Sequence, residues 1–79
     1  MIVRYYATVR DLTGVAEERF DDAPVTLGER LRRATLSGDD LAPTVMILVN
    51  GRNAVFSGGT QTPLTAENEV SIFPPVGGG

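Results

Sequence analysis

A single segment of this 79-residue sequence has the pattern of a helix, and alternating apolar segments lie on both sides of it. Residues 26–29, Thr-Leu-Gly-Glu, have the form of a capping box, in which the threonine hydroxyl accepts a hydrogen bond from the amide three residues later and the glutamate reaches back to the threonine amide. Leu27, Leu31 and Ala34 then recur at helical spacing. The residues Ser37-Gly38-Asp39-Asp40 are expected to end the helix after roughly ten residues.

The segments around this helix have the patterns of β-strands. Residues 2–9 are predicted to form the first strand, with Val3, Tyr5, Ala7 and Val9 on one face. A loop that contains Gly14 leads into a second strand over residues 15–20, which makes a hairpin. The remaining predicted strands are residues 45–49, which end in an Asn50-Gly51 turn, a short return strand at 54–56, and a last strand at 69–73.

The order of these elements predicts an α+β fold in which one main helix packs on one mixed sheet of about four to five strands. A hairpin followed by a helix and further strands is the pattern of a β-grasp domain. We therefore predict a β-grasp domain over residues 1–75 and an extended, flexible tail over residues 76–79. In the last strand, Val70 and Ile72 should face the helix, whereas Phe73 should lie on the opposite face of the sheet.

Several residue types are missing from the chain, and their absence limits its chemistry. The sequence contains no His, Cys or Lys, so it has no imidazole acid or base, no thiolate and no ε-amine. We therefore expect that the chain is not catalytic alone and that it binds no cofactor. No metal site is expected either, because the pairs Asp21-Asp22 and Asp39-Asp40 lack the spacing of a calcium loop and are read as turns.

The charge and hydropathy of the chain bear on its partners. The net charge of −3 is the wrong sign for binding nucleic acid or an anionic membrane surface. No apolar run approaches the roughly 20 residues that a membrane span needs. A cytoplasmic protein that acts with protein partners is therefore expected.

The C-terminal residues 73–79, Phe-Pro-Pro-Val-Gly-Gly-Gly, carry the strongest indication of function. The two prolines lack amide donors, so they should stop the last strand from extending its ladder. The glycines have no Cβ and could thread a channel too narrow for other residues, and a glycine carboxyl is the least hindered acyl group to activate. The alternative is a disordered glycine-rich end without a function.

Three stretches of the sequence resemble the small subunit of molybdopterin synthase, a member of the ubiquitin-like sulfur-carrier family. Residues 5–14 resemble the family's opening, which has two aromatic residues, an alanine, an arginine and a closing glycine. Residues 49–52, Val-Asn-Gly-Arg, resemble its mid-chain turn, and residues 63–79 resemble its Phe-Pro-Pro-Val-x-Gly-Gly ending. The stretch between the helix start and Val45 is shorter than in the synthase subunit, and residues 56–60 also resemble sulfur carriers of cysteine synthesis.

The resemblance implies a carrier whose C-terminal Gly79 bears the chemistry. A ubiquitin-activator-like adenylyltransferase would use ATP to form an acyl-adenylate on Gly79, and a sulfur donor would convert it to a thiocarboxylate. Residues that would line the channel of the large synthase subunit, in a heterotetramer, are Gly78, Gly77, Val76 and Pro75. The product would be molybdopterin, in molybdenum cofactor biosynthesis. The alternatives are sulfur carriage for cysteine, thiamin or tRNA thiolation, or a role as a ubiquitin-like protein modifier.

Three residues are expected to dock the domain on its partners. Phe73 is predicted to be an exposed aromatic beside the functional terminus, and Tyr6 to extend the same patch. Arg10 is predicted to end the first strand, where the family has an arginine that faces a partner, although a solvated arginine is the alternative. Tyr5 is expected to be a core residue. The helix arginines are expected to form a solvated basic face, which comprises Arg30, Arg32 and Arg33.

Overall fold

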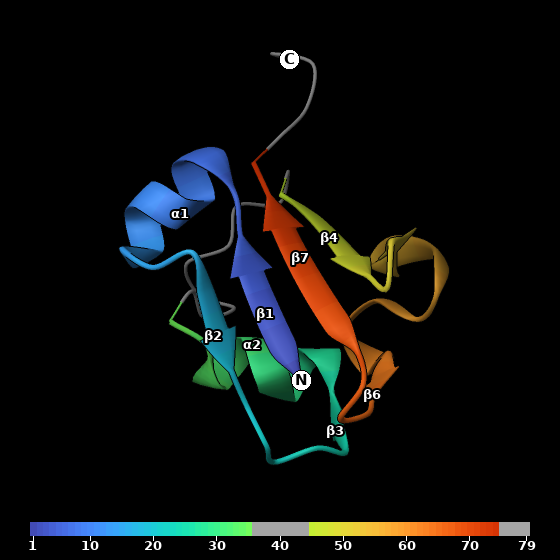
Figure 1. Ribbon diagram of the computed structural model, residues 1–79. Coiled ribbons are helices and arrows are strands. Elements are labelled where there is room, and N and C mark those ends of the chain that lie inside the picture. The colour runs from blue at the N-terminus through green and yellow to red at the C-terminus, as the bar shows by residue number, and fades with distance from the viewer. Residues whose placement is uncertain (36–44, 75–79) are drawn as a thin grey trace.

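The computed structural model describes residues 1–35 and 45–74 of the chain, in which one main helix covers one face of a five-stranded mixed sheet (Figure 1). The strand order is β2-β1-β7-β4-β5. The strands of this sheet are β1 (Ile2–Tyr5), β2 (Glu17–Arg19), β4 (Met46–Val49), β5 (Arg52–Asn53) and β7 (Glu69–Phe73). The predicted α+β class and strand count are confirmed.

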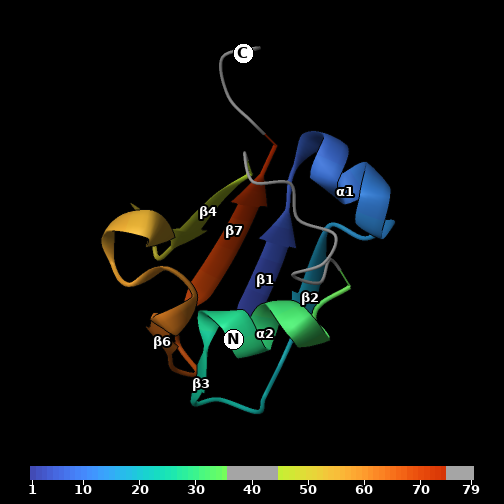
Figure 2. The same cartoon turned by 180° about the vertical axis from the view of Figure 1, so that it is seen from behind.

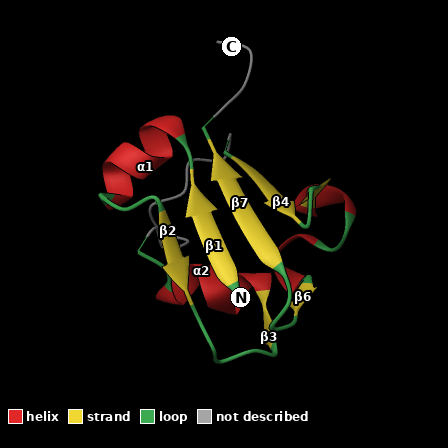
Figure 3. Cartoon of the chain, viewed as in Figure 1, coloured by secondary structure: helices red, strands yellow, loops and turns green. Residues whose placement is uncertain are grey.

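The first and last strands form the centre of the sheet. β1 and β7 run parallel, with Val3 opposite Val70, whereas β2, β4 and β5 are antiparallel to their neighbours. A second sheet of two strands, β3 (Val25–Thr26) and β6 (Pro63–Leu64), lies below the main sheet in Figure 3 and was not predicted. Its strands are only two residues long, so neither shows an alternating pattern.

The main helix, α2 (Leu27–Arg33), lies in front of the strands when the molecule is seen from behind (Figure 2). The Thr26 hydroxyl accepts the Glu29 amide at 3.2 Å, so the predicted N-cap is confirmed. The helix ends at Arg33, earlier than expected, and the predicted stop at residues 37–40 lies outside the described residues. The side chains that it buries against the sheet belong to one core cluster, whose most deeply buried members are Val3, Tyr5, Val9, Leu27, Leu31, Leu64, Val70 and Ile72.

The prediction of a first strand over residues 2–9 is wrong after Tyr5. The chain turns at Ala7, which has a φ of +51°, and enters the helix α1 (Ala7–Thr13). Gly14 ends this helix in the left-handed conformation that glycine tolerates, and its amide donates to the Arg10 carbonyl oxygen at 2.9 Å. Val9 is buried in α1, and it would also be buried if the strand continued. The alternation of apolar residues could therefore not distinguish a helix from a strand at residues 7–9.

The predicted short strand at residues 54–56 is also wrong. The Asn50-Gly51 turn forms as expected, with φ values of +51° and +82°, but the return strand is β5. Residues 54–56 form a 3₁₀ turn, η2 (Ala54–Phe56), and a second one, η3 (Gly59–Gln61), follows. The Asn53 side chain accepts the Val55 amide at 3.0 Å, which bends the chain away from the sheet.

Arg30 is fully buried, which corrects the prediction of a solvated basic face. Its guanidinium is ion-paired with Asp22, and its central carbon lies 4.0 Å from the centre of the Phe20 ring. The hydrogen bond from Arg30, together with the charges of Arg30 and Arg33, lowers the pKa of Asp22 despite the opposing effect of desolvation. Arg33 binds the second Asp22 oxygen at 3.1 Å and stays exposed. The pair ties α2 to the chain after β2.

Candidate functional site

The face of the sheet opposite α2 carries two of the three predicted docking residues, Tyr6 and Phe73. Within residues 1–35 and 45–74, no helix covers this face, which is turned toward the viewer in Figure 1. Alternation along the strands places Arg4, Ser71 and Phe73 on it, because Val3, Tyr5, Val70 and Ile72 point into the core. Phe73 therefore lies on the predicted face, but its side chain is half-buried and not exposed as predicted. On β4, Met46 pairs with Phe73 and Leu48 with Ser71, so two further apolar side chains join it.

Tyr6 and Phe73 form an aromatic platform at the end of β7. Their rings are stacked, with centroids 4.3 Å apart and planes inclined by 6°. The Tyr6 amide donates to the Ile72 carbonyl oxygen at 3.1 Å, and the Tyr6 carbonyl oxygen accepts the Val9 amide at 3.1 Å. Tyr6 thus connects the last residues of β7 to the first turn of α1, and the platform lies directly before Pro74.

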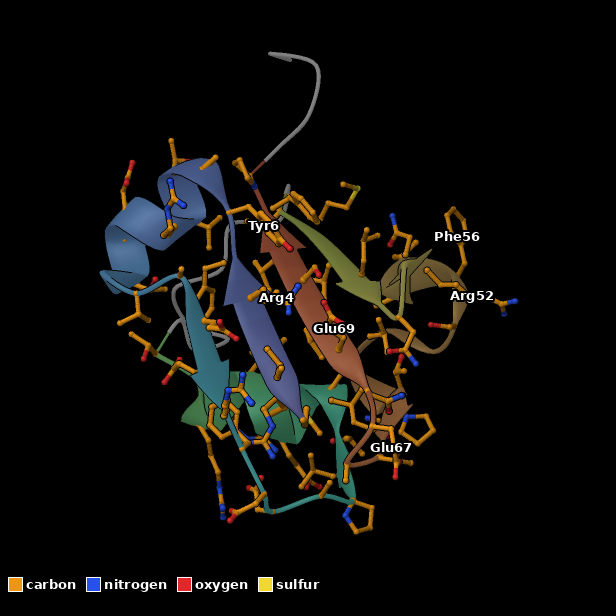
Figure 4. The ribbon with its side chains drawn as sticks, in the orientation of Figure 1. Arg4, Tyr6, Arg52, Phe56, Glu67 and Glu69 are labelled. Atoms are coloured by element: carbon orange, nitrogen blue, oxygen red, sulfur yellow. The ribbon has the colours of Figure 1, made fainter. Side chains whose placement is uncertain are left out.

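The other end of this face is polar. Arg4 forms an ion pair with Glu69 at 2.9 Å, and both side chains are more than 40% exposed (42% and 46%). The Glu69 amide donates to the Asn50 side-chain oxygen at 2.9 Å, which connects the Asn-Gly turn to the start of β7. Figure 4 shows Tyr6 near the C-terminal end of β7 and Arg4 and Glu69 farther down the same face. The face is thus apolar near the C-terminal end of β7 and charged near the opposite end.

Arg10 lies on α1 and not at the end of a strand, so its predicted position is wrong. The helix places Arg10 one turn after Tyr6, with its side chain exposed. Its carbonyl oxygen accepts both the Gly14 amide at 2.9 Å and the Thr13 hydroxyl at 3.1 Å. α1 lies beside the upper end of β7 in Figure 1, so Arg10 belongs to the same end of the molecule as the platform.

The remaining predicted site residues, Pro75, Val76, Gly77, Gly78 and Gly79, lie outside the described residues. In the described part of the chain, no group of three or more acidic side chains is placed to hold a metal ion. No helix among the described residues is long and apolar enough to cross a membrane. What the described site offers is a contact surface at the base of the C-terminal segment.

Met46 and Leu48 belong to this surface but were not predicted from the sequence. The segment 45–49 reads as one continuous apolar run, which is typical of a strand buried on both faces. In the structure the sheet that contains β4 is covered by a helix on one face only, so alternate residues of the run face outward. The pairing of residues 69–73 with residues 45–49 is the information that would have identified Met46 and Leu48 as outward-facing residues.

Comparisons with known proteins agree with this geometry. The model of the ThiS family matches residues 3–79. The chain is 37% identical, over 98% of its length and 96% of the relative, to small archaeal modifier protein 3 of Haloferax volcanii. The crystal structure of small archaeal modifier protein 1 of the same organism matches with a TM-score of 0.74 and 26% identity, over 100% of this chain and 98% of that one.

A further solved structure has the same fold at lower identity. A Pyrococcus furiosus protein described as subunit 1 of the molybdopterin converting factor matches with a TM-score of 0.70 and 24% identity, over 95% of both chains. At this identity the likeness shows the fold alone. Together with the strand order, these matches confirm the ubiquitin-like β-grasp fold.

Proposed function

Because the chain belongs to the ThiS family of ubiquitin-like sulfur carriers, we propose that Gly79 is its reactive residue and that the open sheet face docks the enzymes that act on it. The observation that carries the proposal is the aromatic platform of Tyr6 and Phe73, which lies at the base of the segment Pro-Pro-Val-Gly-Gly-Gly. A half-buried aromatic pair beside an apolar strand is the kind of surface that protein partners bury.

The chemistry proposed for Gly79 needs a partner enzyme. A carboxylate is a poor electrophile, so an adenylating enzyme would let the Gly79 carboxylate attack the α-phosphorus of ATP and release pyrophosphate. A sulfur donor would then attack the acyl carbon and expel AMP, which leaves a thiocarboxylate. The chain supplies no Lys or Cys side chain that would compete for the activated acyl group. ATP and the sulfur source would therefore belong to the partners.

The roles of the neighbouring residues follow from the same proposal. Gly78, Gly77, Val76 and Pro75 would occupy the partner's channel, where the absence of large side chains allows close approach. Phe73 and Tyr6 would contact the partner at the channel entrance, and Met46 and Leu48 would extend that contact. Arg10 on α1 would pair with an acidic group of the partner near the same entrance.

The pathway that receives the sulfur is proposed on the sequence motifs. Residues 5–14, 49–52 and 63–79 resemble the small subunit of molybdopterin synthase, which favours a heterotetramer with a large synthase subunit. A second candidate is a protein modifier, because a relative 37% identical over nearly the whole chain is named as a small archaeal modifier protein. In that case the activated Gly79 would be joined to amines of other proteins.

Intact-mass measurement tests the sulfur-carrier proposal. Incubation of the chain with its cognate adenylating enzyme, ATP and sulfide should raise the mass by the difference between a sulfur and an oxygen atom. A variant that lacks Gly79 is the matched control and should keep its mass and its thermal stability. The proposal is refuted if the mass of the unaltered chain stays the same although the enzyme preparation adenylates another carrier protein.

A second experiment separates the two candidate roles. The thiocarboxylated chain is mixed with a large synthase subunit and the cyclic pterin precursor, and the pterin is assayed for dithiolene. In parallel, cells that produce a tagged chain are searched for covalent adducts on other proteins. Dithiolene without adducts supports the synthase subunit, whereas adducts without dithiolene support the modifier.

A further inference from the structure

The loop that follows β5 exposes two adjacent apolar side chains. Val55 is 72% exposed and Phe56 is 87% exposed, although the chain contains only three phenylalanines. Arg52, which is also exposed, precedes them on β5. Figure 4 shows Arg52 and Phe56 projecting from the same edge of the molecule, away from the core. We call Arg52, Val55 and Phe56 the edge patch.

The backbone beneath the edge patch is held by a dense set of hydrogen bonds. The Ser57 amide donates to the Ala54 carbonyl oxygen at 3.0 Å, and the Thr62 hydroxyl hydrogen-bonds to the carbonyl oxygens of Ser57 at 3.2 Å and Gly59 at 2.6 Å. Ala54 and Thr62 are themselves buried, with 4% and 6% exposure. The loop backbone that carries Phe56 is therefore held in place, so little backbone entropy is lost when a partner covers the Phe56 side chain.

The charge of this region is opposite to that of the rest of the chain. Residues 51–65 contain one charged side chain, Arg52, and no carboxylate, whereas the whole chain has ten acidic residues and a net charge of −3. No ion pair of Arg52 is formed within residues 1–35 and 45–74. An exposed phenylalanine beside an arginine without an ion-pair partner is complementary to an apolar pocket bordered by carboxylates.

We propose that the edge patch is a second docking surface, which fits an apolar, acid-rimmed pocket on the adenylating enzyme. This inference rests on the proposed function. The adenylating enzyme is the expected partner because every function considered above requires the adenylation of Gly79, whichever protein later receives the sulfur. The edge patch is separate from the aromatic platform, since β4 lies between β7 and β5. The enzyme can therefore hold the edge patch while it acts on the C-terminal segment.

Calorimetric titration of the full chain into the cognate adenylating enzyme tests this proposal. Phe56→Ser should weaken binding about tenfold or more, as expected for the loss of a central aromatic contact. Arg52→Glu should weaken it about fivefold, with an effect that shrinks as salt is added. The matched control is Leu12→Ser on α1, which removes an apolar side chain that is 75% exposed and should change the affinity less than twofold.

The outcomes are distinct. Unchanged affinity of both Phe56→Ser and Arg52→Glu overturns the proposal, and so does equal weakening by Leu12→Ser. Lack of any binding by the unaltered chain also overturns it. Adenylation is followed separately by pyrophosphate exchange with the unaltered chain. A chain that binds but is not adenylated refutes the proposed function, while the affinities of the variants still decide the role of the edge patch.

Discussion

The stacking of Tyr6 on Phe73 should contribute a measurable coupling to the stability of the fold. A centroid distance of 4.3 Å and an angle of 6° between the planes place the two rings in direct contact. Such pairs stabilise proteins by about 0.5–1.5 kcal/mol beyond the area that they bury. The perturbation is a double-mutant cycle with Tyr6→Leu, Phe73→Leu and the double variant, because leucine keeps an apolar side chain but removes the ring.

Each single variant should lose the whole coupling, and the double variant should lose it only once. The double variant should therefore be more stable, by about 0.5–1.5 kcal/mol, than the sum of the single effects predicts. For a domain of this size, 1 kcal/mol corresponds to a shift of about 4–8 °C in Tm. Urea unfolding followed by circular dichroism, together with thermal scans, measures all four proteins under one set of conditions.

The control is Tyr6→Phe, which keeps the stacked ring and should keep the coupling with Phe73. The hydrogen bond from the backbone amide of residue 6 to Ile72 is available to every variant. Additive effects within about 0.3 kcal/mol would refute the reasoning. In that case Tyr6 and Phe73 are two independent side chains and not one platform.

Three further predictions concern the scaffold that holds the site. Arg30→Ala should lower the free energy of unfolding by about 2–4 kcal/mol in urea titrations, because it removes a fully buried partner of Asp22. Arg30→Met should lower the free energy of unfolding by a smaller amount. Equal losses of stability in the two variants would contradict this prediction. Burial raises the pKa of the Glu18 carboxyl, but the hydrogen bonds from Tyr5 at 2.5 Å and from the amide of Thr35 at 2.7 Å outweigh it and lower the pKa. The stability that Glu18 contributes should thus be present at neutral pH and fall as the pH drops below about 5 and through the lowered pKa. In Glu18→Gln, the free energy of unfolding should therefore change less steeply with pH. An identical slope in the two proteins would contradict the assignment. Gly51→Ala should lower the free energy of unfolding by about 1 kcal/mol in the same assay, because Gly51 has a φ of +82°. An unchanged stability would contradict this prediction and would show that the backbone of the Asn-Gly turn relaxes.

The sequence predicts the elements whose signal is local, and it fails where tertiary contacts decide. The N-cap at Thr26, the Asn50-Gly51 turn and the last strand were found, because hydrogen bonding or left-handed backbone requires particular residues there. The end of β1 was not found, since Val9 enters the core from a helix as readily as from a strand. A helix over 7–13 is indicated only by Gly14 at its end.

The candidate site was likewise predicted in part. The alternation of residues 69–73 placed Phe73 on the open face and Tyr6 was expected to extend the same patch, but the stacking of the two rings follows from the parallel register of β1 and β7, which no local pattern reveals. The burial of Arg30 depends on Asp22, which lies eight residues earlier on a different segment. The position of Arg30 among other arginines does not indicate that it has such a partner, so its burial could not be predicted from the spacing of residues along the helix.

The position of β7 between β1 and β4 has a consequence for the synthesis of the protein. Ile2 pairs with Glu69, so the centre of the sheet cannot form on the ribosome until residues 69–73 have emerged. Pairings so distant in sequence slow folding and leave strand edges unpaired in the growing chain. Closure of the sheet therefore coincides with the completion of the segment that precedes the glycines. An adenylating enzyme that recognises the closed sheet would thereby select chains whose translation has already passed β7.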